Sequence, residues 1–400
     1  MQNRFPTGYR ETTPRRESPL VRAAFLVAIS SFPVVASEIP WPAEPIDVAV
    51  NLTPIEGPGA NDFYYDLSGA FWNPVTRRLW LCRNGPGDAA SKIWAVREDG
   101  QGSFIIDTRN GNRGEWTGFG DLEDLTQANL NEDTIYGIVE GEERIKELDV
   151  STYGVAVLRN DWDISPFTPP YDGYSGSEGI AFIPDACLAA GGFVDPSGNP
   201  RISQNGMGGL MFVAHQNGGR IYVFDLDRSD SSYTYIGSYK TNFTESCALA
   251  FDRTCGYLYI LHGANFNRIE VTNLGSTQVG SERQLNEVIT YATPTNSPPN
   301  ANMEGIALMS EADCDTGVRS FFLTIDDGGP NSLYWFRRFP CVWFGDLDGN
   351  GVVDGRDIAV FTSQLLDRTG SHGDHGAGPI PDVHIYLSNL QQLIYGLLAS

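Results

Sequence analysis

The chain has 400 residues, 41% of them apolar, and its 50 acidic and 27 basic side chains give a formal net charge of −23. This length suits one large β domain with an appendage, and the acidity argues against nucleic acid or an anionic membrane surface as a partner. The 44 glycines, 24 prolines and 17 tyrosines favour many short strands and turns.

Residues 1–36 are predicted to form a signal peptide. Arginines precede an apolar run at residues 23–36, and Val34-Val35-Ala36 supplies the small residues of a cleavage site. The run is short for a membrane span, and a retained anchor is the alternative. Its removal takes away five Arg and two Glu, which moves the net charge from −23 to −26. We expect a secreted, periplasmic or cell-surface protein, with no membrane span in the mature chain.

Five repeated phrases occupy the middle of the chain. They are DLSGAFWNP from Asp66, DLEDLTQAN from Asp121, GSEGIAFIP from Gly176, ESCALAFDR from Glu245 and NMEGIALMS from Asn302. Further strand-like runs follow each phrase, for example at residues 209–216, 220–226 and 233–239. Four strands in each unit of roughly 40–60 residues is the period of a β-propeller blade.

The fifth unit lacks a fourth strand before Cys341, whereas one unassigned strand-like run, IDVAVNL at residues 46–52, precedes the first unit. Pairing this run with the last blade would close the ring and remove exposed strand edges. We therefore predict an all-β fold over residues 37–343, a five-bladed propeller closed by an N-terminal strand. Six blades are the alternative.

The phrases SGAFWNP…RRLWLC, SEGIAF…GLMFVAH…GRIYVF and LAFDRTCGYLYIL resemble the SdiA-regulated bacterial propellers. More distantly they resemble the β-propeller phytases and their esterase-like relatives. The resemblance covers roughly residues 45–340 and implies a five-bladed propeller with bound calcium and no settled biochemical role. The phosphate-binding lysine clusters expected of an active phytase are missing around these strands, so phytase activity is not expected.

The first strand of each blade is expected to line a central channel, with alternate residues facing the same side. Every blade then contributes at least one carboxylate to the channel mouth. The candidates are Asp66, Asp121, Glu123, Glu178, Glu245 and Glu304. Because so many like charges repel, a Ca²⁺ ion in the mouth is predicted. The alternative is that these acids accept hydrogen bonds from loop amides and connect neighbouring blades.

The second strands end on a further equivalent set, which comprises Arg83, Glu140, His215, His262 and Asp326. His215 and His262 are candidate acid/base groups, and Arg83 is a candidate anion donor. The alternative is an ordinary polar rim facing water. The chain contains no G-x-S-x-G motif, which disfavours a serine hydrolase of the α/β type.

All six cysteines follow the predicted cleavage site, so disulfides are permitted in an exported chain. Proximity within one repeat favours Cys314 with Cys341 and Cys247 with Cys255. Unpaired buried cysteines are the alternative for the others.

The twelve residues DLDGNGVVDGRD from Asp346 have the spacing of a calcium-binding loop. The expected ligands are Asp346, Asp348, Asn350, the backbone carbonyl of Val352, Asp354 and Asp357. Gly351 stands at the sixth position, where the loop turns sharply, and apolar residues at helical spacing follow the loop. The sequence therefore predicts a Ca²⁺ site.

With the helix that follows, the segment GDLDGNGVVDGRDIAVFTSQLL resembles the first repeat of a type I dockerin. Residues 344–400 are accordingly predicted to be a small α-helical, EF-hand or dockerin-like module. Its second repeat survives only as DVHIYLSNLQ from Asp382, because Gly373, His375 and Pro379 stand where ligands are needed. The resemblance implies a cohesin-like or cell-surface protein as partner.

Three functions agree with these patterns. The first is a secreted calcium-binding propeller that binds a glycan-like or small-molecule ligand. The second is a calcium-dependent hydrolase of the esterase, lactonase or phosphoesterase type, acting at the channel mouth. The third is a dockerin-bearing component of a polysaccharide-degrading or surface assembly. The sequence leaves open whether the protein is an enzyme.

Overall fold

The computed structural model describes residues 38–341, apart from 58–59, 61, 86–90, 255, 264–265, 316 and 327. The predicted signal peptide (1–36) and the predicted calcium-binding module (344–400), including its loop ligands, lie outside the described residues. The described part is almost entirely β-structure, which confirms the predicted all-β class. None of its helices has the length and apolar character needed to cross a lipid bilayer.

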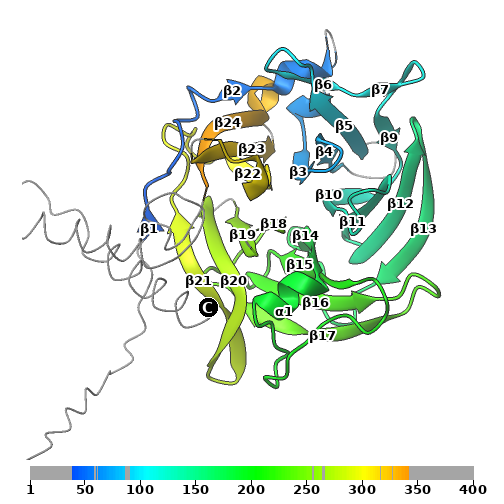
Figure 1. Cartoon of the computed structure of the whole chain (residues 1–400), viewed down its shortest axis with the longest axis vertical. Helices are drawn as coiled ribbons and strands as arrows, with labels where there is room; N and C mark the ends of the chain where they lie inside the picture. The colour runs from blue at the N-terminus through cyan, green and yellow to red at the C-terminus, as the bar shows by residue number, and fades with distance from the viewer. Residues whose placement is uncertain are drawn as a thin grey trace, which may run out of the picture. The chain divides into compact units, whose positions relative to one another are not determined.

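The strands of the first three units pair antiparallel in chain order (Figure 1). The first unit consists of β3 (Leu67–Asn73), β4 (Arg78–Arg83), β5 (Lys92–Glu98) and β6 (Phe104–Ile106), with β9 (Glu115–Thr117) also on β5 and β7 (Thr108–Arg109) paired to β8 (Asn112–Arg113). The second consists of β10 (Asp121–Thr126), β11 (Thr134–Glu140), β12 (Arg144–Thr152) and β13 (Val155–Asp163). The third consists of β14 (Ser177–Pro184), β15 (Gly209–His215), β16 (Arg220–Leu226) and β17 (Tyr233–Lys240).

The remaining strands complete two more such units. The fourth consists of β18 (Ala248–Asp252), β19 (Tyr257–His262), β20 (Arg268–Val279) and β21 (Glu282–Tyr291), with β1 (Glu38–Ile39) on β21. The last consists of β22 (Asn302–Leu308), β23 (Val318–Asp326) and β24 (Leu333–Pro340), and β2 (Val50–Asn51) adds to β24. The predicted pairing of residues 46–52 with the last unit is thus confirmed over two residues.

Helices are short and lie in the connections. The α-helix α1 (Asp185–Ala190) lies in the connection between β14 and β15. The 3₁₀ helices are η1 (Thr53–Glu56), η2 (Asp62–Tyr64), η3 (Glu311–Asp313) and η4 (Gly329–Asn331).

The first strands of the units contact one another in a closed cycle, from β3 through β10, β14, β18 and β22 back to β3. This cycle is the arrangement of a β-propeller. Small residues at the aligned positions of the repeats allow it. A Cβ atom on Gly69 would lie 2.5 Å from the Asp124 Cα, and one on Gly179 would lie 2.8 Å from the Ala248 Cα. Four of the five repeats therefore keep a glycine or alanine at this position, where neighbouring backbones touch, and the second repeat carries Asp124 there.

Apolar clusters fill the spaces between consecutive units in the described part of the chain. Trp72 of the first unit, for example, stacks on Phe322 of the last unit, with ring centroids 6.0 Å apart. Burying a large apolar side chain contributes about 1.5–3 kcal/mol. Since each unit buries its apolar face against the next, the units stabilise one another.

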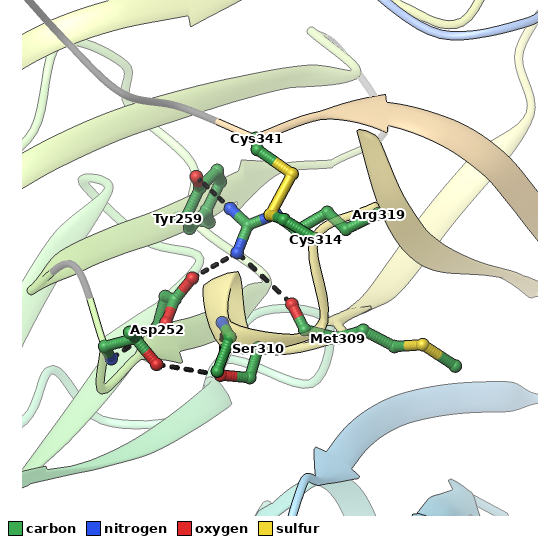
Figure 2. Close-up of a disulfide and its surroundings, with 9 residues drawn as sticks. Asp252, Tyr259, Met309, Ser310, Cys314, Arg319 and Cys341 are labelled. Carbon is green, nitrogen blue, oxygen red and sulfur yellow. Dashed lines mark hydrogen bonds and ion pairs between the residues drawn. A yellow bond between two sulfur atoms is a disulfide. The ribbon is translucent and has the colours of Figure 1, made fainter. Parts of the chain in front are cut away.

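A disulfide joins Cys314 to Cys341, with Cα atoms 6.2 Å apart (Figure 2), as proximity favoured. It ties the turn at η3 to the residue that follows β24. The structure departs from the other favoured pairing, because Cys247 is a free, buried thiol among the described residues and Cys255 lies outside them. The Cys247 Sγ instead donates to the carbonyl oxygens of Met303 at 3.3 Å and Leu261 at 3.4 Å.

Candidate functional site

Bulges at the start of the inner strands position the candidate carboxylates. Register shifts occur in β3, β10, β14 and β22, at equivalent places near Ser68, Glu123, Glu178 and Glu304. A β-bulge bends its strand and redirects the side chain that it displaces. Glu123 and Asp124 are both almost fully buried, at 2% and 1% exposure, because both faces of β10 are covered. The bulge shifts the register of β10 on β11 at Glu123.

Three carboxylates lie together at one end of the inner strands. Asp121, Glu123 and Glu140 each place one oxygen so that all three oxygens lie within 4.8 Å of one another. Asp121 and Glu140 are directly opposite each other in the β10–β11 pair. The sequence analysis assigned Glu140 to the polar rim only, and the structure adds it to the acidic set.

Further carboxylates extend this group, and we call the whole set the acidic rim. Its members are Asp121, Glu123, Glu140, Glu178, Glu245, Glu304 and Asp326. The carboxyl groups of Glu178 and Glu140 lie near enough to affect each other's pKa. The like charges of Asp326 and Glu245 act on Glu304.

Burial and crowding disfavour ionisation in five members of the acidic rim. Burial, reinforced by neighbouring carboxylates, raises the pKa of Glu123 and of Glu178 well above the ordinary value. It raises the pKa of Glu304 to about 8, and it also raises the pKa of Asp121 and of Glu140. Desolvation and like charge both oppose the charged form, so a cation would restore it.

Two oxygens of the acidic rim lack partners. Within the described residues, Glu304 Oε2 and Glu140 Oε1 are buried and accept no hydrogen bond. Glu304 is 7% exposed. A buried polar atom without a partner costs about 1–3 kcal/mol, so these oxygens are available to a ligand that coordinates carboxylates.

Glu123 partly fits the alternative role of connecting blades. Its Oε2 accepts a hydrogen bond from Ser68 Oγ at 3.0 Å, across the contact between the first and second units. Asn84 Nδ2 donates to its Oε1 at 3.1 Å. These neutral donors orient the carboxylate without cancelling its charge.

Asp66 and Arg83 lie in a separate ion-pair group. The Arg83 guanidinium donates to Asp62 Oδ1 at 2.7 Å, and its Nη2 lies 3.9 Å from Asp66 Oδ2. Lys92 also contacts Asp62. Because Asp62 already balances Arg83, this arginine is poorly placed to hold a substrate anion.

Both histidines of the predicted rim set are fully buried with both ring nitrogens occupied. His215 Nδ1 accepts from the Asn217 amide at 3.0 Å, and its Nε2 lies 3.2 Å from the Pro169 carbonyl. His262 Nδ1 lies 2.6 Å from the Glu245 carbonyl and its Nε2 lies 3.1 Å from Glu270 Oε2.

These contacts favour structural roles for the two histidines. A carbonyl oxygen only accepts, so His262 Nδ1 carries a proton and cannot take one from Ser246 Oγ, which lies 3.3 Å away. A general base needs a free nitrogen within reach of the substrate. Catalytic use of His215 or His262 stays a prediction from sequence.

Asp124, the fourth residue of the phrase DLEDLTQAN, was not among the candidate site residues predicted from the sequence. Its carboxylate accepts hydrogen bonds from the backbone amides of Ile180 at 2.9 Å and Leu249 at 3.5 Å, so it joins β10 to β14 and β18. Burial raises its pKa well above the ordinary value. The available signal was an acid at a position where the other repeats carry glycine or alanine.

No protein-family model and no curated protein matches the chain. Among solved structures, it is similar to a putative 6-phosphogluconolactonase from Bacteroides fragilis, with 12% identity, 67% of this chain and 69% of that chain covered, and a TM-score of 0.35. It is also similar to the periplasmic gluconolactonase PpgL of Pseudomonas aeruginosa, with 13% identity, 57% of this chain and 55% of that chain covered, and a TM-score of 0.32. A third similar structure is the β-propeller domain of Cps50 (Swd1) from Myceliophteria thermophila, with 11% identity, 68% of this chain and 82% of that chain covered, and a TM-score of 0.33. The resemblances to SdiA-regulated propellers and dockerins stay predictions.

Proposed function

We propose that this chain is an exported, five-bladed β-propeller that binds calcium at its acidic rim and presents the ion to a small organic ligand. The strand pairings and the closed cycle of inner strands support five blades. One observation carries the cation site. In the described part of the chain, Glu304 Oε2 and Glu140 Oε1 are buried without partners beside other carboxylates.

The donor chemistry favours calcium over a transition metal. The three clustered ligand groups, Asp121, Glu123 and Glu140, are all carboxylates. Calcium takes six to eight oxygen ligands in a flexible geometry, whereas zinc prefers thiolate and imidazole. Glu178 and Glu304 would complete the set, and bound water would fill the remaining positions.

Calcium titration should distinguish the rim from the predicted loop at residues 346–357. By isothermal titration calorimetry, the mature chain is expected to bind two ions. Glu304→Gln should weaken one site at least tenfold, because a neutral amide replaces a charged ligand. Asp346→Ala should weaken the other site by a similar factor.

Glu98→Gln is the matched control, since Glu98 pairs on the surface with Arg77 and both side chains are more than 40% exposed. It should leave both affinities unchanged. Two intact sites in Glu304→Gln would contradict calcium binding at the rim.

An aromatic side chain beside the rim supports an organic ligand. Tyr171 is 38% exposed. Partial burial raises the pKa of its hydroxyl, and the carboxylates of Glu140 and Asp121 raise it further. An exposed ring next to a bound cation can stack on a sugar or a planar small molecule while the cation binds its oxygens. A glycan-like or small-molecule ligand is therefore proposed.

A calcium-dependent hydrolase is the second candidate, and the buried Glu178, whose pKa is raised well above the ordinary value by burial and by neighbouring carboxylates, favours it. In this candidate Glu178 stays protonated and outside the calcium ligands, so it would act as a general acid while the ion would polarise an ester, lactone or phosphoester. Turnover should need calcium, and Glu178→Gln should lower kcat about 100-fold or more. Folded, calcium-loaded protein without turnover on all three substrate classes would exclude the enzyme.

The C-terminal residues 344–400 are proposed to fold around the Ca²⁺ ion of the loop at 346–357 and to tether the propeller to a cohesin-like or cell-surface partner. The spacing of the loop ligands supports the ion site. The degenerate second repeat makes a stabilised tail the simpler role for the segment.

A further inference from the structure

A pocket lies at the end of the inner strands that is opposite the acidic rim. The acidic rim surrounds their first residues, whereas this pocket is formed by the loops after β3 and β10 and by the turn after β18. Its volume is about 500 Å³. Its walls include Val75, Leu130, Phe182, Met207, Arg228 and Arg253. We call it the arginine pocket.

Arg253 reaches across the ring into this pocket. From the turn after β18 its Nη1 donates to the Ala128 carbonyl at 3.0 Å, and its Nη2 donates to the Gln127 carbonyl. The guanidinium lies 5.5 Å from the centre of the Phe182 ring. These contacts fix the plane of the guanidinium at the pocket wall.

Within the described residues, no carboxylate balances the positive charge of Arg253. Its neighbour Asp252 pairs with Arg319, and no acid of the part that the structure describes forms an ion pair with Arg253. Burial lowers the pKa of Arg253 to about 10. Carbonyl oxygens supply hydrogen bonds without compensating charge, so a desolvated cation at this place favours a bound anion.

Arg228, the other cation of the pocket, has carboxylate partners that balance its charge. It pairs with the buried Glu147 and lies 3.7 Å from Glu132 Oε2. These two acids would repel a dianion such as phosphate, whereas a singly charged group on Arg253 meets less repulsion. The walls at Val75, Leu130 and Phe182 suit an apolar body.

We propose that the arginine pocket binds a small organic monocarboxylate with a planar, apolar body. The carboxylate accepts hydrogen bonds from the N–H groups of Arg253 that the Ala128 and Gln127 carbonyls leave open, since those two bonds use only two of the five guanidinium donors. The apolar body packs on Phe182 and Leu130. This site is independent of the acidic rim and needs no metal ion.

Benzoate and its neutral isostere benzamide test the proposal in the mature chain by calorimetry. Benzoate should bind saturably and at least tenfold more tightly than benzamide. Chelating calcium should leave this affinity unchanged, which separates the pocket from the rim. Arg253→Gln should weaken benzoate binding at least tenfold, and Arg253→Lys should weaken it less.

Val75→Trp is the second variant, because Val75 is 54% exposed at the edge of the pocket and its replacement obstructs the space without touching Arg253. It should block benzoate while the fold stays intact by circular dichroism. Absence of binding to folded wild-type protein, equal affinity for benzamide, or full affinity in Arg253→Gln would each overturn the proposal.

Discussion

Replacing Arg319 with methionine is expected to lower the free energy of unfolding by about 3–5 kcal/mol, because it leaves a buried carboxylate without its partner. The side chains of Arg319 and Asp252 are 0% and 1% exposed and form an ion pair. The guanidinium also donates to Tyr259 Oη at 2.7 Å and to the Met309 carbonyl at 3.2 Å (Figure 2). Chemical denaturation of the protein measures the loss.

Arg77→Ala is the control for the buried pair. Arg77 pairs with Glu98 and Asp313 but is 48% exposed, so its loss should cost about 1 kcal/mol or less. The double variant Arg319→Met with Asp252→Leu should recover part of the lost stability, because it also removes the unpaired charge. An Arg319→Met protein as stable as Arg77→Ala would show that the buried pair contributes little.

Metal-free protein is expected to be more stable at pH 5 than at pH 8, unlike a protein whose carboxylates are paired with cations. Glu304 in the folded chain has a pKa of about 8, against an ordinary value of 4.5. Between these values the folded state holds a proton that the unfolded chain has released, so stability falls as pH rises through this window. Each tenfold difference in proton affinity between the two states corresponds to about 1.4 kcal/mol, so the loss amounts to several kcal/mol.

Thermal unfolding in chelator across this pH range measures the effect. Glu304→Gln should flatten the dependence, since an amide does not titrate. Added calcium should raise the melting temperature far more at pH 8 than at pH 5, because protons compete with the ion for the same oxygens. A metal-free protein whose stability rises from pH 5 to pH 8 would contradict the assignment of protonated acids to the rim.

The fold contains buried acids in two different settings. Asp252 is buried against an arginine partner and belongs to the framework. Glu304 is buried among other acids and needs a proton or a cation. The first arrangement contributes to stability, whereas the second gives up stability and provides a site for an ion.

The sequence alone determined the repeat, the position of most strands and the closing role of the N-terminal run. The predicted runs at 209–216 and 220–226 became β15 and β16 almost residue for residue. This success has a simple cause, because period-2 alternation and turn residues are local properties. The repeated phrases showed a small residue at positions such as Gly69. The structure gives the reason, because the backbone of Gly69 lies against the backbone of Asp124.

The tertiary structure decided which polar residues act together. The bulge at Glu123 shifts the alternation on which a strand-based prediction depends. The occupied nitrogens of His262 and the carbonyl partners of Arg253 come from contacts with other strands and loops. Hydrogen bonding and desolvation are set by such tertiary contacts, so the sequence could propose an acidic rim while only the fold could show which of its described oxygens lack a partner.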